Sequence, residues 1–87
     1  MARDENFFQE IGTITIEPRN VGSRSGYLAF VFRCEGKVEW YELRSETKLL
    51  FPDIENDELA EFVDKKVNLV AKKLGGKKLL VELVTVV

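Results

Sequence analysis

The sequence predicts a small, predominantly β domain with one helix, in which five strands close into a barrel. Alternating apolar residues mark three strand-like segments before a helix-like stretch at Glu55 to Lys66, and two strand-like segments follow it. A glycine interrupts the first segment, where the first strand of a closed barrel has to bend. A Gly75-Gly76 pair separates the last two segments, as the turn of a hairpin does.

Length and composition limit the number of domains and the kinds of chemistry. Eighty-seven residues suffice for one domain, and we expect residues 1–6 to be a flexible N-terminal tail and residues 7–87 to be a single domain. No apolar run approaches the roughly 20 residues that cross a bilayer, so we expect a cytoplasmic protein without membrane contact. Histidine is absent and Cys34 is the sole cysteine, which excludes disulfide frameworks and Cys/His zinc sites.

The first strand is predicted from Phe7 to Glu17. Phe7 and Ile11 lie at odd positions before Gly12, and Ile14 and Ile16 lie at even positions after it. A β-bulge produces such a change of parity, and glycine is a residue commonly found there. We therefore expect a bulge at Gly12, which would bend the strand.

The second and third strands are predicted to form a hairpin after a loop of residues 18–26, which is rich in glycine and serine. They span Tyr27 to Cys34 and Lys37 to Arg44, and Glu35-Gly36 is read as a two-residue turn. This turn fixes the pairing and hence the two faces of the hairpin. The predicted core face holds Leu28, Phe30, Phe32, Tyr41 and Leu43. The predicted outer face holds Tyr27, Val31, Arg33, Val38, Trp40 and Arg44.

The helix and the last two strands complete the predicted barrel. Carboxylates from Asp53 to Asp57 suit a helix N-terminus and Lys65-Lys66 suit its C-terminus. Residues that should plug the barrel recur at helical spacing, namely Leu59, Phe62 and Val63. The final strands, Val67 to Leu74 and Lys77 to Val86, are predicted to form a hairpin over the glycine pair.

From Phe7 to Val86 this order resembles the OB-fold: a glycine-bent first strand, a Gly/Ser loop, a hairpin, a short helix, and then Phe62-Val63-Asp64-Lys65-Lys66-Val67 leading into the fourth strand. The resemblance lies in the order and lengths of the elements. It implies a binding site on the face of strands 2 and 3, with the loops that join strands 1–2 and 4–5. Proteins of this fold bind single-stranded nucleic acids, oligosaccharides or other proteins, so the class of ligand stays open.

Aromatic and basic residues converge on that face and on those loops. Trp40 and Tyr27 offer ring faces on which unpaired bases can stack, and the cations can hold phosphates. The predicted nucleic-acid-binding residues are Arg19, Arg24, Tyr27, Arg33, Trp40, Arg44, Lys72, Lys73, Lys77 and Lys78. Each group also has a structural reading. Trp40 can lie under a covering segment or a partner subunit, Arg44 can pair with Tyr27, and the lysines can prevent edge-to-edge strand pairing.

The leading functional hypothesis is a non-enzymatic module that binds single-stranded DNA or RNA. The alternative is a protein–protein interaction or assembly module, including a homo-oligomer, which would use Trp40 and the apolar segment Leu79 to Val87. The net charge of −2 and the glutamates Glu39 and Glu42 near the proposed groove favour this alternative. We predict no catalytic residues, cofactor or metal site, because no nucleophile–base pair is visible and the acidic stretch 53–64 lacks the central glycine of a calcium loop.

Overall fold

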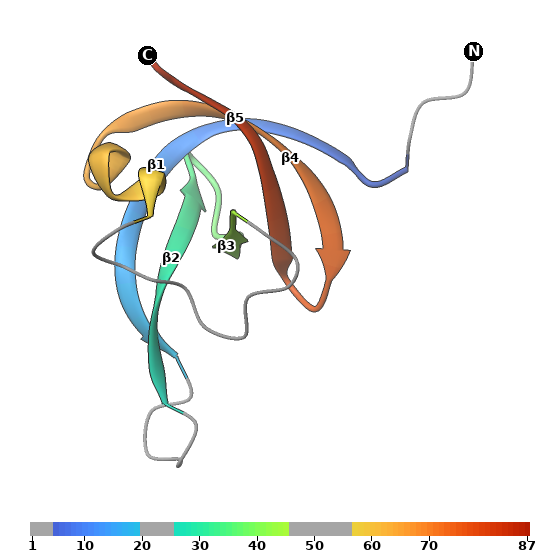
Figure 1. Cartoon of the computed structure of the whole chain (residues 1–87). Coiled ribbons are helices and arrows are strands. Elements are labelled where there is room, and N and C mark those ends of the chain that lie inside the picture. Colours follow the sequence, from blue (N-terminus) through green and yellow to red (C-terminus); the bar gives the residue numbers. More distant parts are fainter. Residues whose placement is uncertain (1–4, 20–25, 46–56) are drawn as a thin grey trace.

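A computed structural model of the chain describes residues 5–19, 26–45 and 57–87. The elements are β1 (Phe7–Arg19), β2 (Tyr27–Cys34), β3 (Trp40–Arg44), the single 3-10 turn η1 (Glu58–Phe62), β4 (Lys66–Gly75) and β5 (Lys78–Val86). The strands are hydrogen-bonded in the order β1-β2-β3-β5-β4, and β4 returns to β1, so the sheet closes in a ring (Figure 1). Neighbouring strands are antiparallel except β3 and β5, which are parallel. The predicted five strands in their predicted sequence order are confirmed.

The long first strand has one continuous parity, so the predicted bulge is wrong. The pairing of β1 with β4 runs through Gly12 without a register shift, and the pairing with β2 begins at Gly12 and also shows none. Phe8 and Ile14 are buried, whereas Phe7 and Ile11, which were expected to face inward, are 43% and 41% exposed. Even-numbered positions therefore face the core along this part of the strand.

Close packing of β1 against β2 explains the glycine at this position. A Cβ atom at Gly12 would lie 2.2 Å from the backbone oxygen of Arg33 and 2.8 Å from the Phe32 ring atom Cζ. Gly12 pairs with β2 through Cys34 and with β4 through Val67. Glycine is thus needed for the close approach of the neighbouring strand rather than for a bend.

The connection between β2 and β3 is longer than the predicted two-residue turn. Residues 35–39 join the strands, and Gly36 has a φ of 71°. As a result, Arg33 pairs with Trp40 and not with Val38. The register differs from the predicted one by two positions, and because side chains alternate with a period of two, the residues of β2 and β3 keep their predicted faces. The predicted outer face is nevertheless partly covered, since Val31, Glu42 and Arg44 on it are buried.

The core face of this hairpin is largely as predicted. Phe30, Phe32 and Leu43 are fully buried, and Tyr41 packs partly buried against them. Leu28 was expected in the core but is 51% exposed. It pairs with Pro18 in the part of the β1–β2 ribbon that extends beyond its pairing with β3 (Figure 1). No other described strand lies beside it there to cover it.

No α-helix is present in the described part of the chain, so the predicted helix is wrong there; residues 55 and 56 lie outside the described residues. Asp57 caps η1 by accepting a hydrogen bond from the Leu59 amide at 2.9 Å. The turn ends at Val63, which is extended and forms a parallel bridge with Ile14 of β1. The Asp64 amide then donates to the Ile14 carbonyl at 2.7 Å. Pairing with β1 therefore outweighs local helical preference.

The short turn still supplies the predicted plug. Leu59 is 2% exposed, and Phe62 and Val63 are partly buried against the core. The buried core cluster comprises Phe8, Ile14, Phe30, Phe32, Cys34, Leu43, Leu59, Val67, Leu69, Ala71 and Leu79. No helix in the described residues has the length and apolar character needed to span a membrane.

The β4–β5 hairpin turns one residue later than predicted. Gly75 pairs with Lys78, so the two loop residues are Gly76 and Lys77, with φ angles of 58° and 60°. Two positive φ angles define the I′ type of turn that suits the twist of a hairpin. Lys77 is thus a non-glycine residue in the left-handed region.

Candidate functional site

The β4–β5 turn lies against the beginning and middle of β3 and brings a lysine to two aromatic rings. The Glu42 amide donates to the carbonyl of Lys77 at 2.8 Å, which fixes the turn beside the strand. The Lys77 ammonium lies 5.3 Å from the ring centroid of Trp40 and 5.6 Å from that of Tyr41. The Arg19 guanidinium, from the end of β1, lies 4.1 Å from the Trp40 ring centroid. We call these four residues the Trp40 cluster.

Next to this cluster lies the buried carboxylate of Glu42, whose burial the sequence did not predict. Glu42 is 3% exposed and accepts hydrogen bonds from the Tyr27 hydroxyl at 2.7 Å and from Arg44 Nη2 at 2.8 Å. Arg44 is itself only 8% exposed, and Arg19 Nε lies 3.9 Å from Glu42. A phosphate could reach Arg44 only by displacing this buried ion pair, so Arg44 is placed as a structural residue.

The Tyr27 side chain likewise contacts other residues of the protein. The Arg44 guanidinium lies 5.8 Å from its ring centroid, as the structural reading of this pair anticipated. Burial first, and then the hydrogen bond to Glu42, raise the pKa of the Tyr27 hydroxyl above its ordinary value of 10.0. The hydroxyl therefore remains a protonated donor to the carboxylate at neutral pH.

Arg33, also predicted to hold phosphate, forms a two-pronged ion pair with Glu17 on the neighbouring strand β1. Its Nη2 and Nε atoms lie 2.6 and 2.8 Å from the two carboxylate oxygens. The Arg33 side chain is 53% exposed, so this pair is accessible to solvent and to salt. The hydrogen bond from Arg33 is the largest influence that lowers the pKa of Glu17 below its ordinary value of 4.5.

The pairing of Glu17 with Arg33 predicts a specific titration. In the native protein the Glu17 carboxyl should titrate below pH 4.5, and in Arg33→Gln its pKa should rise back toward that value. Because the folded-state pKa is depressed, the pair stabilises the fold at higher pH, and this contribution is lost as the pH falls through the folded-state pKa. Carboxyl carbon shifts followed by NMR measure it.

Lys37→Gln is the matched control for this titration. It removes the partner that lies 2.9 Å from Glu10 and should leave the Glu17 curve unchanged. A Glu17 pKa that stays the same in Arg33→Gln would contradict the assignment.

The four predicted lysines of the β4–β5 hairpin are all exposed, and none has a carboxylate within ion-pair distance among the described residues. Their faces differ. Lys78 pairs with Glu42, and Lys72 pairs with Leu80, which in turn pairs with Arg44, so both lie on the outer face that carries Trp40. Lys73 pairs with the buried Leu79 and lies on the other face.

The structure thus brings together part of the predicted set. Trp40, Arg19, Lys77, Lys78 and Lys72 share one surface, whereas Arg33 and Arg44 are held by carboxylates and Arg24 lies outside the described residues. Tyr41 was predicted only as a core residue, and its ring also reaches Lys77. The pattern Trp40-x-Glu42-x-Arg44 was the available signal for Glu42, because alternate residues of a strand share a face.

Among the described residues, no group of three or more cysteine, aspartate or glutamate side chains is placed to hold a metal ion. Cys34 is buried, and burial is the largest influence that raises the pKa of its thiol. Comparison with protein-family models, with curated proteins and with solved structures finds no match to this chain.

Proposed function

We propose that this chain is an OB-fold module without enzymatic activity that binds single-stranded nucleic acid at the Trp40 cluster. The strand order β1-β2-β3-β5-β4 in a closed ring, with a plug between β3 and β4, supports the assignment of the fold. In this fold the ligand lies on the face of strands 2 and 3 near the loop that joins strands 4 and 5. The Trp40 cluster lies at that junction.

The position of Lys77 over Trp40 and Tyr41 carries the proposal. It joins the lysine-rich turn and the aromatic edge of β3 into one surface. An exposed cation–π contact is worth about 0.5–1 kcal/mol, whereas stacking a base on an aromatic ring is worth about 1–3 kcal/mol. A base can therefore take the place of a cation on the indole, and the displaced cation remains beside the ring to contact a phosphate.

The charges set the expected strength of binding. Arg19 and Lys77 lie over the indole and Lys72 and Lys78 lie on the same face of the sheet, while Arg33 and Arg44 are neutralised by glutamates. Each phosphate contact to a single strand contributes about −0.7 to the slope of log K against log salt, so four cations give a slope of at most about −3. We expect modest affinity that is strongest at low salt.

Trp40 is the only tryptophan, so its fluorescence reports directly on the proposed site. A mixed ten-nucleotide single strand at about 20 mM salt should quench it, because a stacked base replaces a cation on the ring. Lys77→Gln with Lys78→Gln should weaken binding and reduce the magnitude of the salt slope by about 1.4, since two phosphate contacts are lost. Fluorescence titrations across a salt series measure both.

The double variant Lys65→Gln with Lys66→Gln makes the same change of charge and serves as a control. These two lysines lie where β4 begins, at the end of the strand opposite the β4–β5 turn. This control should leave the slope nearly unchanged. Absence of quenching at low salt, or equal effects of the two double variants, would count against the site.

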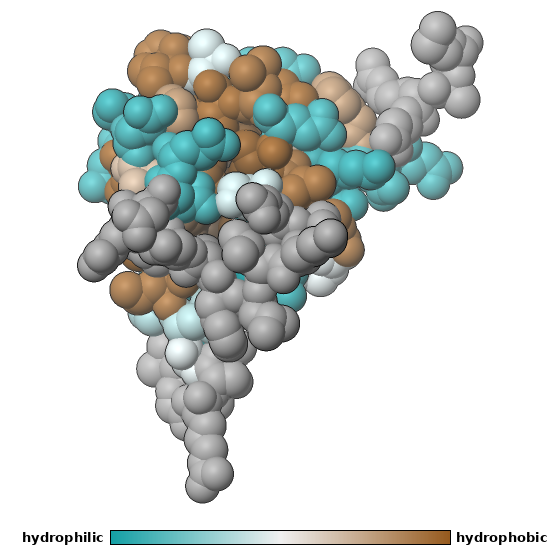
Figure 2. Space-filling model, viewed as in Figure 1, coloured by the Kyte–Doolittle hydropathy of each residue, from teal (hydrophilic) through white to brown (hydrophobic). Residues whose placement is uncertain are grey.

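The alternative, a protein-interaction module, is favoured by a different region. Leu83, Val86 and Val87 are 59%, 52% and 65% exposed at the end of the chain. Figure 2 shows hydrophobic residues gathered over the upper part of the view, where β1, β4 and β5 lie in Figure 1. Sedimentation at several salt concentrations distinguishes the two, because a homo-oligomer held by apolar residues persists at high salt whereas binding of nucleic acid does not.

A further inference from the structure

The second half of β5 has one edge that no described strand pairs with. β3 pairs with β5 only from Lys78 to Leu80, whereas β4 pairs with β5 as far as Val86. Along residues 81–86 the edge opposite β4 is therefore without a described strand. An unpaired edge presents a row of N–H and C=O groups to which an extended peptide can add as a further strand.

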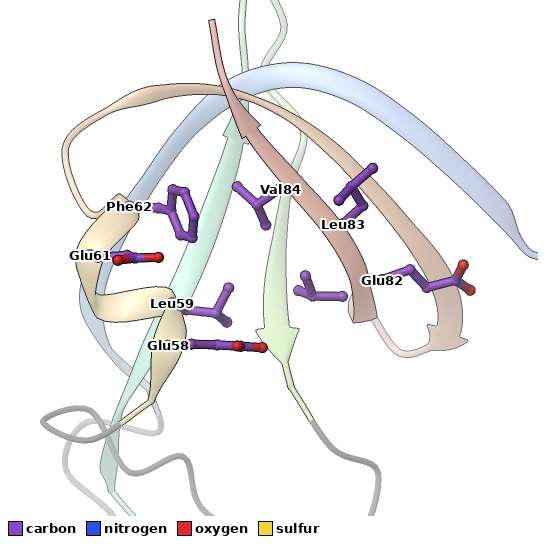
Figure 3. A pocket seen from close by; sticks show the side chains of 8 residues that line it. Glu58, Leu59, Glu61, Phe62, Glu82, Leu83 and Val84 are labelled. Atoms are coloured by element: carbon purple, nitrogen blue, oxygen red, sulfur yellow. The ribbon is translucent and has the colours of Figure 1, made fainter.

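Beside this edge lies an open cavity of about 240 Å³ between η1 and β5. Its lining residues are Glu58, Leu59, Glu61, Phe62, Val81, Glu82, Leu83 and Val84. In Figure 3 the side chains of Leu59 and Phe62 point from η1 toward Val84 of β5. Leu59 is almost fully buried, so these residues form an apolar floor that an aliphatic side chain can cover.

The wall formed by η1 is acidic. Glu58 and Glu61 extend from η1 on the side of the cavity (Figure 3), and both are exposed. Neither has a basic group within ion-pair distance among the described residues. Glu82 points away on the other side of β5. A second copy of this chain would bring the same carboxylates to the edge and be repelled, whereas a basic segment would be attracted.

We propose that the β5 edge accepts an extended basic peptide segment of another protein as an added strand. The backbone of the segment pairs with residues 81–86, and one aliphatic side chain enters the cavity between η1 and β5. Lysine or arginine side chains of the segment lie beside Glu58 and Glu61. The site shares no residue with the Trp40 cluster, so it stands or falls independently of nucleic-acid binding.

The test uses the full chain and an acetylated octapeptide of alternating lysine and valine, followed by amide NMR. Shift changes should be confined to residues 58–62 and 81–86, and amide exchange in 81–86 should slow as new hydrogen bonds form. The same peptide with glutamate in place of lysine should not bind. A peptide methylated at alternate backbone nitrogens should bind at least about tenfold more weakly, because it cannot complete the pairing.

Variants test the charge argument. Glu58→Gln with Glu61→Gln should weaken binding about three- to tenfold, the range expected for two exposed ion pairs. Glu39→Gln, a charge change in the exposed β2–β3 connection outside the cavity, should alter the affinity less than twofold. Equal losses in both variants, unimpaired binding of the methylated peptide, or shift changes centred on Trp40 would overturn the proposal. Shifts at residues 81–86 that depend on protein concentration without peptide would show that a second copy is the occupant, and would overturn it as well.

Discussion

Gly12→Ala is expected to lower the free energy of unfolding by about 3 kcal/mol or more, because the added methyl group would clash with backbone atoms that cannot rotate away. The added Cβ would meet the backbone oxygen of Arg33 at 2.2 Å, a distance no carbon can keep from a backbone atom. β1 cannot move away from β2 at this point without disturbing β4, since Gly12 pairs with both strands. For a domain of this length the total stability is about 4–13 kcal/mol, so the loss is a large fraction of it.

Urea denaturation followed by Trp40 fluorescence measures this effect. Gly36→Ala is the matched control, because Gly36 has a φ of 71° and open space around its missing Cβ. There the only cost is that of a left-handed backbone, about 1–2 kcal/mol. If the two substitutions destabilise the domain equally, steric contact between β1 and β2 is not the reason for the glycine at position 12.

Glu42→Ala is expected to cost about 3 kcal/mol, at the lower end of the range for breaking a buried ion pair. The substitution leaves the guanidinium of Arg44 buried without the carboxylate that lies 2.8 Å away. It also removes the acceptor that holds the Tyr27 hydroxyl at 2.7 Å. The cost arises from removing a carboxylate beside a buried guanidinium rather than from the intrinsic strength of the pair.

Glu17→Ala provides the comparison, because it removes the partner of the half-exposed Arg33. An exposed pair contributes at most about 1 kcal/mol, so the difference between the two variants isolates the effect of burial. In addition, Glu42→Ala combined with Arg44→Met should recover part of the lost stability, because the double variant no longer buries the guanidinium that Glu42 contacts. Equal urea midpoints for the Glu42 and Glu17 variants would contradict this account.

Local patterns predicted the strands and the faces of β2 and β3 because both depend only on alternation. A shift of two positions leaves alternation unchanged, which explains why Trp40 lies on the predicted face although its partner is Arg33 rather than Val31. For the same reason, the alternation of residues could not reveal that the β2–β3 connection is longer than two residues. The parity predicted for β1 was wrong because Ile11 is an exposed apolar residue, and such residues are common on protein surfaces.

The short 3-10 turn in place of the predicted helix and the ion pairs could not be predicted because they depend on residues distant in sequence. Ile14 draws the backbone of Asp64 into pairing with β1 and so ends η1 after a short turn. In the same way Glu17 and Glu42 reach Arg33 and Tyr27 across strands. The sequence therefore did not show that Arg33 and Arg44, both predicted to hold phosphate, are paired with carboxylates.

Neighbouring strands of the closed sheet differ widely in the number of residues that they pair. β3 and β5 share three residue pairs, whereas β1 shares eight with β2 and seven with β4. Thermal breathing should therefore begin at this short seam, where the fewest hydrogen bonds have to break. Lys77 lies at one end of the seam, and the edge of β5 that no described strand pairs with continues from the other. A molecule bound at either end would oppose the separation of β3 from β5. The rigidity of the closed sheet would therefore depend on which ligand is bound.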